Sequence, residues 1–326
     1  MTFGRGARPA LYVGTLLAIL TLNFLLPRLM PGDPLDALQD PTTGTFVHDD
    51  QLRERVLVYY GLDRPIGEQY VRYLADLTRG DLGWSIRLNQ PVAELIGTRL
   101  PWTLLLVLPS LAIGSVIATV AGVEAAWARG SSVDLALVVA LTVLHAIPIY
   151  VLGVLAIALA SVQLRWLPLG GAATPFKSYA SLVEQMADIT AHWLLPATVL
   201  IVEVATARFL LLRNTVLAVI STEYIAVARA KGLGEGALKY RHALRNALLP
   251  SVTGLAAQLG FALGGAVFVE SLFAYPGIGR LLTDAVGARD YPVLQGVFLL
   301  MSAAVLLANT VADMAYGMLD PRTRSA

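Results

Sequence analysis

Six stretches of this chain are each long and apolar enough to cross a lipid bilayer. A helix of about 20 apolar residues spans the hydrocarbon core of a bilayer. Because lipid offers no hydrogen-bonding partner to the backbone, apolar runs of this length are expected to be helical there. The sequence therefore predicts an all-α polytopic membrane protein with six transmembrane helices, at residues 10–30, 102–123, 133–160, 193–212, 251–273 and 293–318.

The composition agrees with a membrane protein and excludes several kinds of site. Of the 326 residues, 56% are hydrophobic and 14% are charged, whereas soluble domains carry about 25% charged residues. The net charge is +1, so no strongly basic field points to nucleic acid. Cysteine is absent, which excludes disulfides, thiolate metal sites and cysteine nucleophiles. The first apolar run is followed by PRLMPGDP rather than a small-residue cleavage site, so we expect it to remain as an anchor.

The basic residues of the short loops predict the orientation in the membrane. With six spans both termini lie on one side, and arginine and lysine gather at the termini and in the segment 213–250. Short loops rich in these residues face the cytoplasm. We therefore expect both termini and 213–250 to be cytoplasmic and 31–100 to lie outside.

The chain is expected to have two parts, residues 1–100 and 101–326. The first holds the N-terminal anchor and a helical extracytoplasmic segment, in which 51–62 and 68–77 carry apolar residues at helical spacing. Gly61 and Gly80 are positioned to end these two helices. The second part is a five-helix core that contains the charged segment 213–250.

Within that charged segment the sequence predicts two helices joined at a glycine. Ser221 or Thr222 is suited to cap the first, which runs through Ala228 to Lys231, and Gly232 suits the left-handed residue that ends it. The second helix is expected to reach Leu248 before Pro250.

The second helix should present two different faces. Arg241 and Arg245 fall on one stripe, and the other stripe consists of Ala237, Tyr240, Leu244, Ala247 and Ser251. Such a helix can sit in a groove of a partner protein or lie flat on anionic lipid. The residues alone leave both possibilities open.

The third span contains two features that point either to a path through the membrane or to simple packing. Pro148 should kink this span, and His145 lies nearby within the membrane, where ionisable residues are functional candidates. Glu203 in the fourth span is a further candidate. The four histidines share no metal-ligand spacing, so no metal site is expected. The chain has no phosphate-binding lysine motif of the Walker A kind, so it is not expected to bind ATP itself.

The charged segment resembles the cytoplasmic coupling loop of binding-protein-dependent ABC importer permeases. Ala226, Val227 and Ala228 stand six to four residues before Gly232, and Leu249 and Pro250 supply the closing pair. The glutamate that opens the family pattern is replaced by Ala226. ARAKGL and RHALRNALLP are similar to the dipeptide, oligopeptide and nickel branch, as are MPGDP, YGLDRP, GDLGWS, RLPWTL, FVESLFAYPGIGRLL and RDYPVLQG elsewhere in the chain.

The resemblance implies a permease subunit with the type I ABC importer fold, in a bacterial or archaeal cytoplasmic (inner) membrane. The chain would form the path for peptides delivered by an extracytoplasmic binding protein, beside a second, homologous permease subunit. Two ATPase subunits would hold ATP and magnesium, so the chain itself is not expected to be an enzyme or to hold a cofactor. The residues implied in coupling to them are Ala226, Ala228, Arg229, Lys231, Gly232, Arg241, Arg245, Leu249 and Pro250.

Other cargoes and one other class of protein remain open from the sequence. Nickel, other metal chelates or glutathione-like solutes fit the same architecture. A proton-coupled secondary transporter is the alternative from another class, although no inverted repeat is visible. A membrane protease would need a nucleophile–base pair or a metal-binding histidine cluster in the spans, and neither is visible. The expected residues of the translocation path are His145, Pro148 and Glu203.

Overall fold

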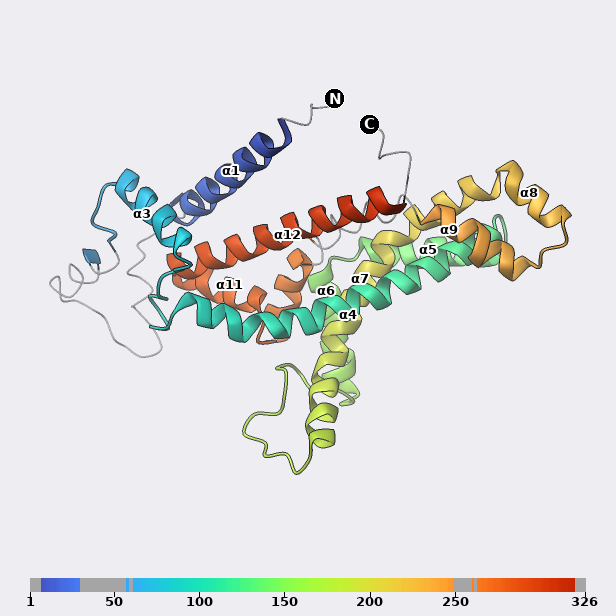
Figure 1. Ribbon diagram of the computed structural model, residues 1–326. Coiled ribbons are helices and arrows are strands. Elements are labelled where there is room, and N and C mark those ends of the chain that lie inside the picture. The colour runs from blue at the N-terminus through green and yellow to red at the C-terminus, as the bar shows by residue number, and fades with distance from the viewer. Residues whose placement is uncertain (1–6, 30–56, 59–60, 249–259, 261–262, 320–326) are drawn as a thin grey trace. The chain divides into compact units, whose positions relative to one another are not determined.

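The computed structural model describes residues 7–29, 57–58, 61–248, 260 and 263–319, and its regular structure is helical (Figure 1). Over these ranges extended pairing is limited to a single bridge between Trp84 and Pro91. The prediction of an all-α protein is therefore confirmed. The helices are α1 (Ala7–Leu29), α3 (Ile66–Thr78), α4 (Val92–Trp127), α5 (Ser132–Ala146), α6 (Ile149–Ala156), η2 (Ile157–Gln163), α7 (Leu182–Ile220), α8 (Glu223–Ala230), η3 (Ala237–Ala243), α9 (Leu244–Ala247), α11 (Ile278–Ala288) and α12 (Tyr291–Leu319).

Three of the described helices are long and apolar enough to cross a membrane: α4, α7 and the 291–311 part of α12. A fourth span is reached if α5 and the α6–η2 helix count together. Shorter apolar helices cover Gly14–Leu29 and Leu263–Leu272. The protein is thus an integral membrane protein, while the number six stays a prediction. Of the predicted fifth span, 251–273, residues 251–259 and 261–262 lie outside the described part of the chain.

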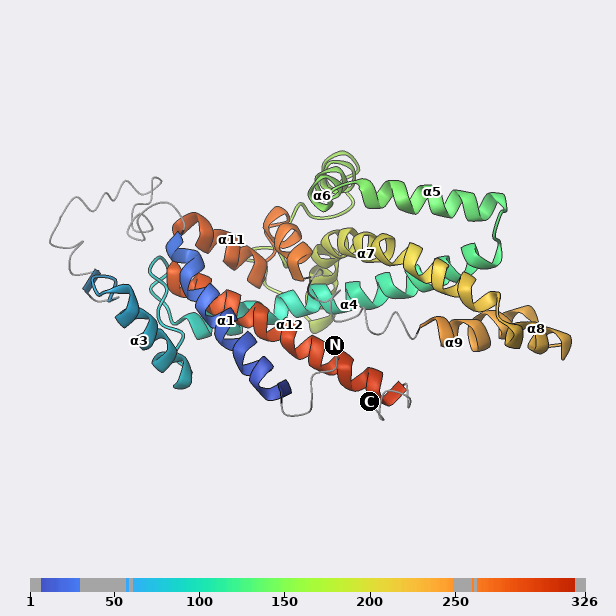
Figure 2. The ribbon, with the colours of Figure 1, turned by 90° about the horizontal axis from the view of Figure 1, so that it is seen from above.

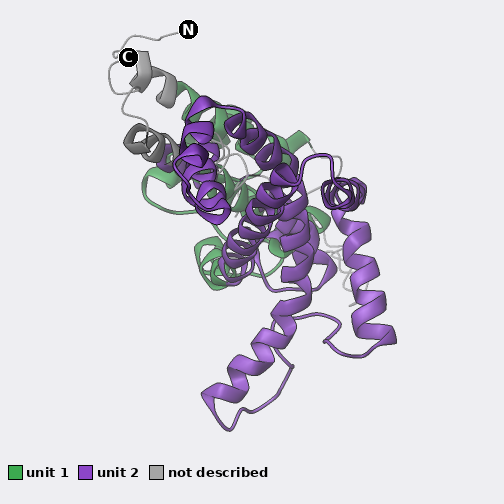
Figure 3. Ribbon diagram, turned by 90° about the vertical axis from the view of Figure 1, so that its right-hand side faces the viewer, with its two compact units in different colours: residues 1–101, 280–303 green, residues 102–279, 304–326 purple. Residues whose placement is uncertain are grey.

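The chain forms two compact units (Figure 3). Unit 1 comprises residues 1–101 and 280–303, and unit 2 comprises 102–279 and 304–326. The predicted division into 1–100 and 101–326 stays a prediction, and the units differ from it in grouping 280–303 with the N-terminal part.

Unit 1 contains α3 (Ile66–Thr78), which includes the whole of the extracytoplasmic helix predicted at 68–77. Its C-terminal end is followed by Gly80, whose backbone N–H donates to the carbonyl of Leu77 at 3.0 Å. Of the predicted helix 51–62, residues 51–56 and 59–60 lie outside the described part of the chain. Helix α3 is joined to α1 by Arg28, which donates through Nη2 to Gln69 Oε1 at 2.8 Å.

The core of unit 2 forms where α4, α6 and α7 pack together, with Leu106, Leu200 and Phe273 among its fully buried side chains. At Gly114 helix α4 packs tightly against α7. A Cβ added to Gly114 would lie 2.8 Å from Val204 Cβ and 2.9 Å from the carbonyl oxygen of Ile201. Small residues of this kind allow membrane helices to pack closely.

We expect Gly114→Val to destabilise unit 2, because the new side chain has no room between α4 and α7. Overpacking of this kind costs about 1–3 kcal/mol. The measurement is the thermal unfolding midpoint of the purified protein in detergent. Gly97→Val in the same helix is the matched control, since a Cβ at Gly97 meets nothing within 4 Å. A midpoint for Gly114→Val equal to that of the control would contradict this packing.

The third predicted span is broken rather than kinked. Helices α5 and α6–η2 meet at an angle of 97°. Ile147, which precedes Pro148, is extended with ψ 121°, as expected for a residue before proline. The expectation of a single kinked helix is corrected here, because Ile147 leaves the helical conformation altogether.

A buried carboxylate links the start of α11 to α4 within unit 2. The Glu270 side chain is fully buried, and its two oxygens accept from the Thr103 hydroxyl at 2.7 Å and the Gly279 backbone N–H at 2.6 Å. The Thr103 hydroxyl oxygen in turn accepts from the backbone N–H of Ile278 at 2.8 Å. This network satisfies two N–H groups of the first turn of α11, which no helical carbonyl can satisfy.

Candidate functional site

The charged segment folds as the two predicted helical pieces, α8 and η3–α9. They lie together at one end of unit 2, beside the ends of α4 and α7 (Figures 1 and 2). Thr222 stands at the N-terminal cap of α8, although its hydroxyl donates to the carbonyl of Val219 rather than to α8. Gly232 has φ +81°, the left-handed conformation predicted for it.

The second piece begins as a π-helix, and this changes which side chains it buries. The buried residues are Leu238, Ala243 and Ala247, whereas Tyr240 of the predicted apolar stripe is 42% exposed. In a π-helix the hydrogen bonds join residues five apart rather than four. Leu238 and Ala243 therefore share a face, and the predicted stripe is wrong over its first half.

A carboxylate at the cytoplasmic-side end of α4, by the predicted orientation, holds the second piece in place. Glu124 accepts from Lys239 Nζ and from the Tyr240 hydroxyl, each at 2.7 Å. The hydrogen bond to Glu124 raises the pKa of the Tyr240 hydroxyl above its usual value, so this hydroxyl stays protonated and remains a donor. We call the segment 223–248 together with its contacts to α4 and α7 the seated segment.

The turn between the two pieces is held by Trp127, the last residue of α4. Its indole Nε1 donates to Glu235 Oε2 at 2.6 Å, and Glu235 Oε1 lies 3.3 Å from Arg229 Nε. The Arg229 guanidinium and the Lys239 ammonium lie 5.7 Å and 5.9 Å from the centre of the indole ring, which places both cations in the range of cation–π attraction. One aromatic side chain thus contacts both halves of the segment.

Apolar packing also attaches the seated segment to α4 and α7. Ala247 packs in a cluster with Val123 and Ala126 of α4 and Val216 of α7. Between the two helical pieces, Asn246 Nδ2 donates to the Tyr224 hydroxyl at 2.8 Å. The segment thus contacts both α4 and α7.

The structure leaves most of the predicted coupling residues on the outer surface of the seated segment. Ala228 is the exception, at 8% exposed, because it packs inward. Leu249 and Pro250 lie outside the described residues. The exposed members are Ala226, Arg229, Lys231, Gly232, Arg241 and Arg245. Small apolar positions between exposed cations can approach a partner surface that carries acidic or carbonyl groups.

Two of the three predicted path residues, His145 and Glu203, are linked through Thr206 in unit 2. His145 Nδ1 at the end of α5 lies 3.4 Å from the Thr206 hydroxyl, which donates to the carbonyl of Glu203 at 3.1 Å. His145 and Pro148 are exposed and Glu203 is half-buried. Their role in a path stays a prediction.

Sequence reasoning missed the contacts by which Glu124, Trp127 and Glu235 position the segment, and it did not place Arg208 of α7 in the interior. Arg208 is 7% exposed and donates to Ser115 Oγ at 2.8 Å. The available signal was an acidic residue and a tryptophan at the end of an apolar run, where interfacial aromatics gather. Their partners lie more than a hundred residues further along the chain, so the pairing was invisible.

Gly232 should tolerate substitution poorly because of its backbone conformation, not for lack of room. A Cβ there meets nothing within 4 Å of this chain, while its φ of +81° disfavours side chains. We expect Gly232→Val to lower substrate-stimulated ATPase activity of the assembled complex several-fold, and Gly232→Asn to lower it less, since asparagine adopts this conformation more readily. Equal activities of both variants and wild type would contradict a need for this turn.

Comparisons with known proteins agree on one family. Residues 114–325 match the family described as binding-protein-dependent transport system inner membrane component. The chain is 38% identical over 314 residues to a putative peptide permease protein of Brucella suis, covering 96% of both chains. It is 36% identical over 330 residues to the di/tripeptide transport system permease protein DppB of Pseudomonas aeruginosa, covering 97% of both.

A solved structure shares the fold. An inward-facing structure of the MetNI methionine ABC transporter superposes with a TM-score of 0.55 at 20% identity, covering 70% of this chain and 97% of that one. The type I importer permease fold is thereby shown. The family match covers the seated segment as well as α5, α7 and α12. The chain therefore belongs to the family of inner membrane components of binding-protein-dependent transport systems.

Proposed function

We propose that this chain is a permease subunit of an ATP-driven importer and that the seated segment couples it to a cytoplasmic ATPase subunit. The observation that most supports coupling is the attachment of the seated segment to α4 and α7. Glu124, Trp127 and the Ala247 cluster hold the segment firmly on α4 and α7, while its opposite surface of alanine, lysine and arginine is left exposed. A helix that is fixed on one face and exposed on the other is suited to transmit movement between two proteins.

The proposed partners follow from the family. A second permease subunit would complete the path, two ATPase subunits would supply ATP and Mg²⁺, and a binding protein would deliver cargo on the other side. No catalytic role falls to this chain. His145, Pro148 and Glu203 are proposed to border the path, supported by the broken helix that places His145 against the Thr206 turn of α7.

Peptides are the proposed cargo, supported by the two relatives named for peptide and di/tripeptide transport. The test is uptake of a labelled dipeptide into proteoliposomes that contain the assembled complex and its binding protein. We expect uptake that requires ATP and is competed by unlabelled tripeptide. Uptake of a nickel chelate or glutathione with no uptake or competition by peptides would overturn the peptide assignment. Uptake driven by a proton gradient without ATP would overturn the importer assignment.

The proposed orientation can be tested with single cysteines, because the natural chain has none. Ala226 lies on the exposed surface of the seated segment, and Phe176, in the loop before α7, is fully exposed. A membrane-impermeant maleimide added to intact cells should label Phe176→Cys and should label Ala226→Cys only after permeabilisation. The reverse pattern would contradict a cytoplasmic position of the seated segment.

A further inference from the structure

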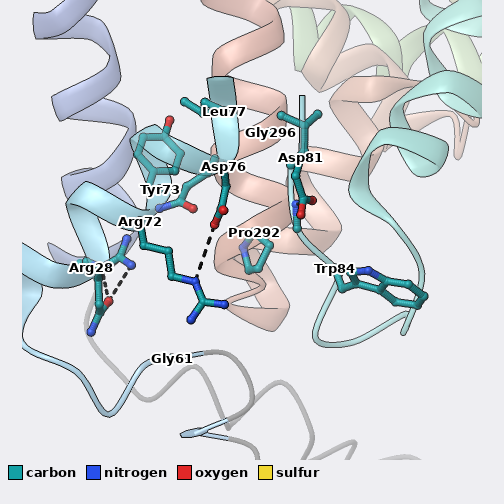
Figure 4. A pocket seen from close by; sticks show the side chains of 14 residues that line it. Arg28, Gly61, Arg72, Tyr73, Asp76, Leu77, Asp81, Trp84, Pro292 and Gly296 are labelled. Atoms are coloured by element: carbon teal, nitrogen blue, oxygen red, sulfur yellow. Dashed lines mark hydrogen bonds and ion pairs between the residues drawn. The ribbon is translucent and has the colours of Figure 1, made fainter. Parts of the chain in front are cut away.

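Unit 1 contains a pocket of about 360 Å³ beside α3, the turn at 81–84 and the first turns of α12 (Figure 4). Pockets that bind small molecules begin at about 300 Å³. Its lining combines charged and polar side chains with a few apolar ones. The polar members that matter here are Arg28, Arg72, Tyr73, Asp76, Asp81 and Gln295.

Two of these side chains bury a polar atom that lacks a hydrogen-bond partner among the described residues. They are the Tyr73 hydroxyl of α3 and the Gln295 Nε2 of α12. Buried polar groups are nearly always paired, so an unpaired group calls for an explanation. Burial raises the pKa of Tyr73 to about 12, which keeps its hydroxyl protonated. Both atoms are hydrogen-bond donors, and both residues belong to the lining of the pocket.

Arg28 adds a positive charge held in a fixed position. Its Nε and Nη2 donate to Gln69 Oε1 at 3.2 Å and 2.8 Å, and its Nη1 donates to the carbonyl of Phe24 at 2.9 Å. The guanidinium also lies 3.6 Å from the centre of the Phe24 ring. A guanidinium has five N–H groups, so these three contacts leave capacity for a ligand oxygen.

The other charges of the pocket are held less firmly. Arg72 Nε lies 3.8 Å from Asp76 Oδ2, and both side chains are partly exposed. Asp81 Oδ1 accepts from the Gly83 backbone N–H at 2.8 Å. The two guanidinium groups and the two carboxylates give the pocket opposite charges in equal number. Electrostatic complementarity of this kind selects a ligand that carries both charges.

We propose that this pocket binds a small dipolar molecule whose anionic group meets Tyr73, Gln295 and Arg28 and whose ammonium group meets Asp76 or Asp81. A short peptide with free termini has this chemistry, and its choice as the ligand rests on the proposed cargo. The head group of phosphatidylethanolamine also combines an anion with an ammonium group. The experiment therefore has to separate a soluble peptide from a bound lipid.

The test uses the assembled complex in lipid nanodiscs, without its binding protein, and dialanine as the probe in isothermal titration calorimetry. Tyr73→Phe and Gln295→Leu each remove one unpaired polar group with little change of volume. We expect the double variant to bind dialanine at least tenfold more weakly, and dialanine blocked at both termini not to bind to wild type. Tyr70→Phe is the matched control, since Tyr70 is on the same helix but contacts the Thr21 hydroxyl outside the pocket.

Three outcomes would overturn this inference. They are no dialanine binding, binding that the double variant leaves unchanged, and native mass spectrometry that shows phosphatidylethanolamine retained by wild type but not by the double variant. The thermal unfolding midpoint shows that the variants are folded. Peptide transport by the same complex separates this result from the proposed function: transport without pocket binding overturns the pocket alone, and pocket binding without transport overturns the cargo alone.

Discussion

Glu124→Ala should uncouple the transporter while leaving its membrane helices folded. The substitution removes the acceptor of Lys239 and Tyr240, so the seated segment loses its polar attachment to α4. The Glu124 side chain is 40% exposed, and partly exposed pairs contribute only about 0–1 kcal/mol to folding. Coupling free energies between sites correspond to about 5–150-fold effects. We therefore expect substrate-stimulated ATPase activity to fall at least about fivefold with little change in the thermal unfolding midpoint.

Two further variants make this expectation specific. Glu124→Gln keeps one carbonyl acceptor and should lose less activity than Glu124→Ala. Glu223→Ala removes an exposed acidic residue from the first turn of α8 and should leave coupling near the wild-type level. Full activity of Glu124→Ala in a correctly assembled complex would show that the attachment to α4 is not needed.

Glu270→Ala should have the largest effect on stability. It would leave the Gly279 N–H and the Thr103 hydroxyl without their acceptor in a fully buried site. Each buried group left unpaired costs about 1–3 kcal/mol, and the lost side chain leaves a cavity as well. We expect a markedly lower unfolding midpoint and a reduced yield of folded protein. Glu68→Ala, on an exposed turn of α3, is the control and should behave as wild type.

Glu270→Gln provides the complementary measurement. Glutamine keeps one oxygen acceptor but replaces the other with an N–H donor, which faces a donor in the network. Its unfolding midpoint should fall between those of wild type and Glu270→Ala. A midpoint of Glu270→Ala within error of wild type would contradict a stabilising role for this carboxylate.

Features set by local sequence were predicted well. The apolar runs around α4 and α7 predicted membrane-crossing helices because length and hydropathy are sufficient signals for them. Gly232 marked the end of α8 because the left-handed conformation strongly favours glycine. Thr222, one of two expected caps, stands at the start of α8, but its hydroxyl bonds to Val219 rather than to α8. The branch of the family followed from short motifs spread along the chain, and the comparisons confirmed it.

Features set by tertiary contacts were not predictable in this way. The π-helical start of the second piece moved Leu238 and Ala243 onto the buried face, and helical spacing by fours cannot anticipate it. The 97° break at Pro148 exceeded the expected kink because a proline specifies where a helix stops but not the direction of the next one. The pairing of Glu124 with Lys239 joins residues that are far apart in sequence.

Contact between the seated segment and an ATPase subunit is the central claim, and site-specific crosslinking tests it most directly. A photo-crosslinking amino acid at Arg241, on the exposed side of the segment, should form an adduct with the ATPase subunit of the assembled complex. The same amino acid at Phe176 should form none. Adducts from position 176 but not from 241, or adducts of position 241 with lipid alone, would contradict the claim.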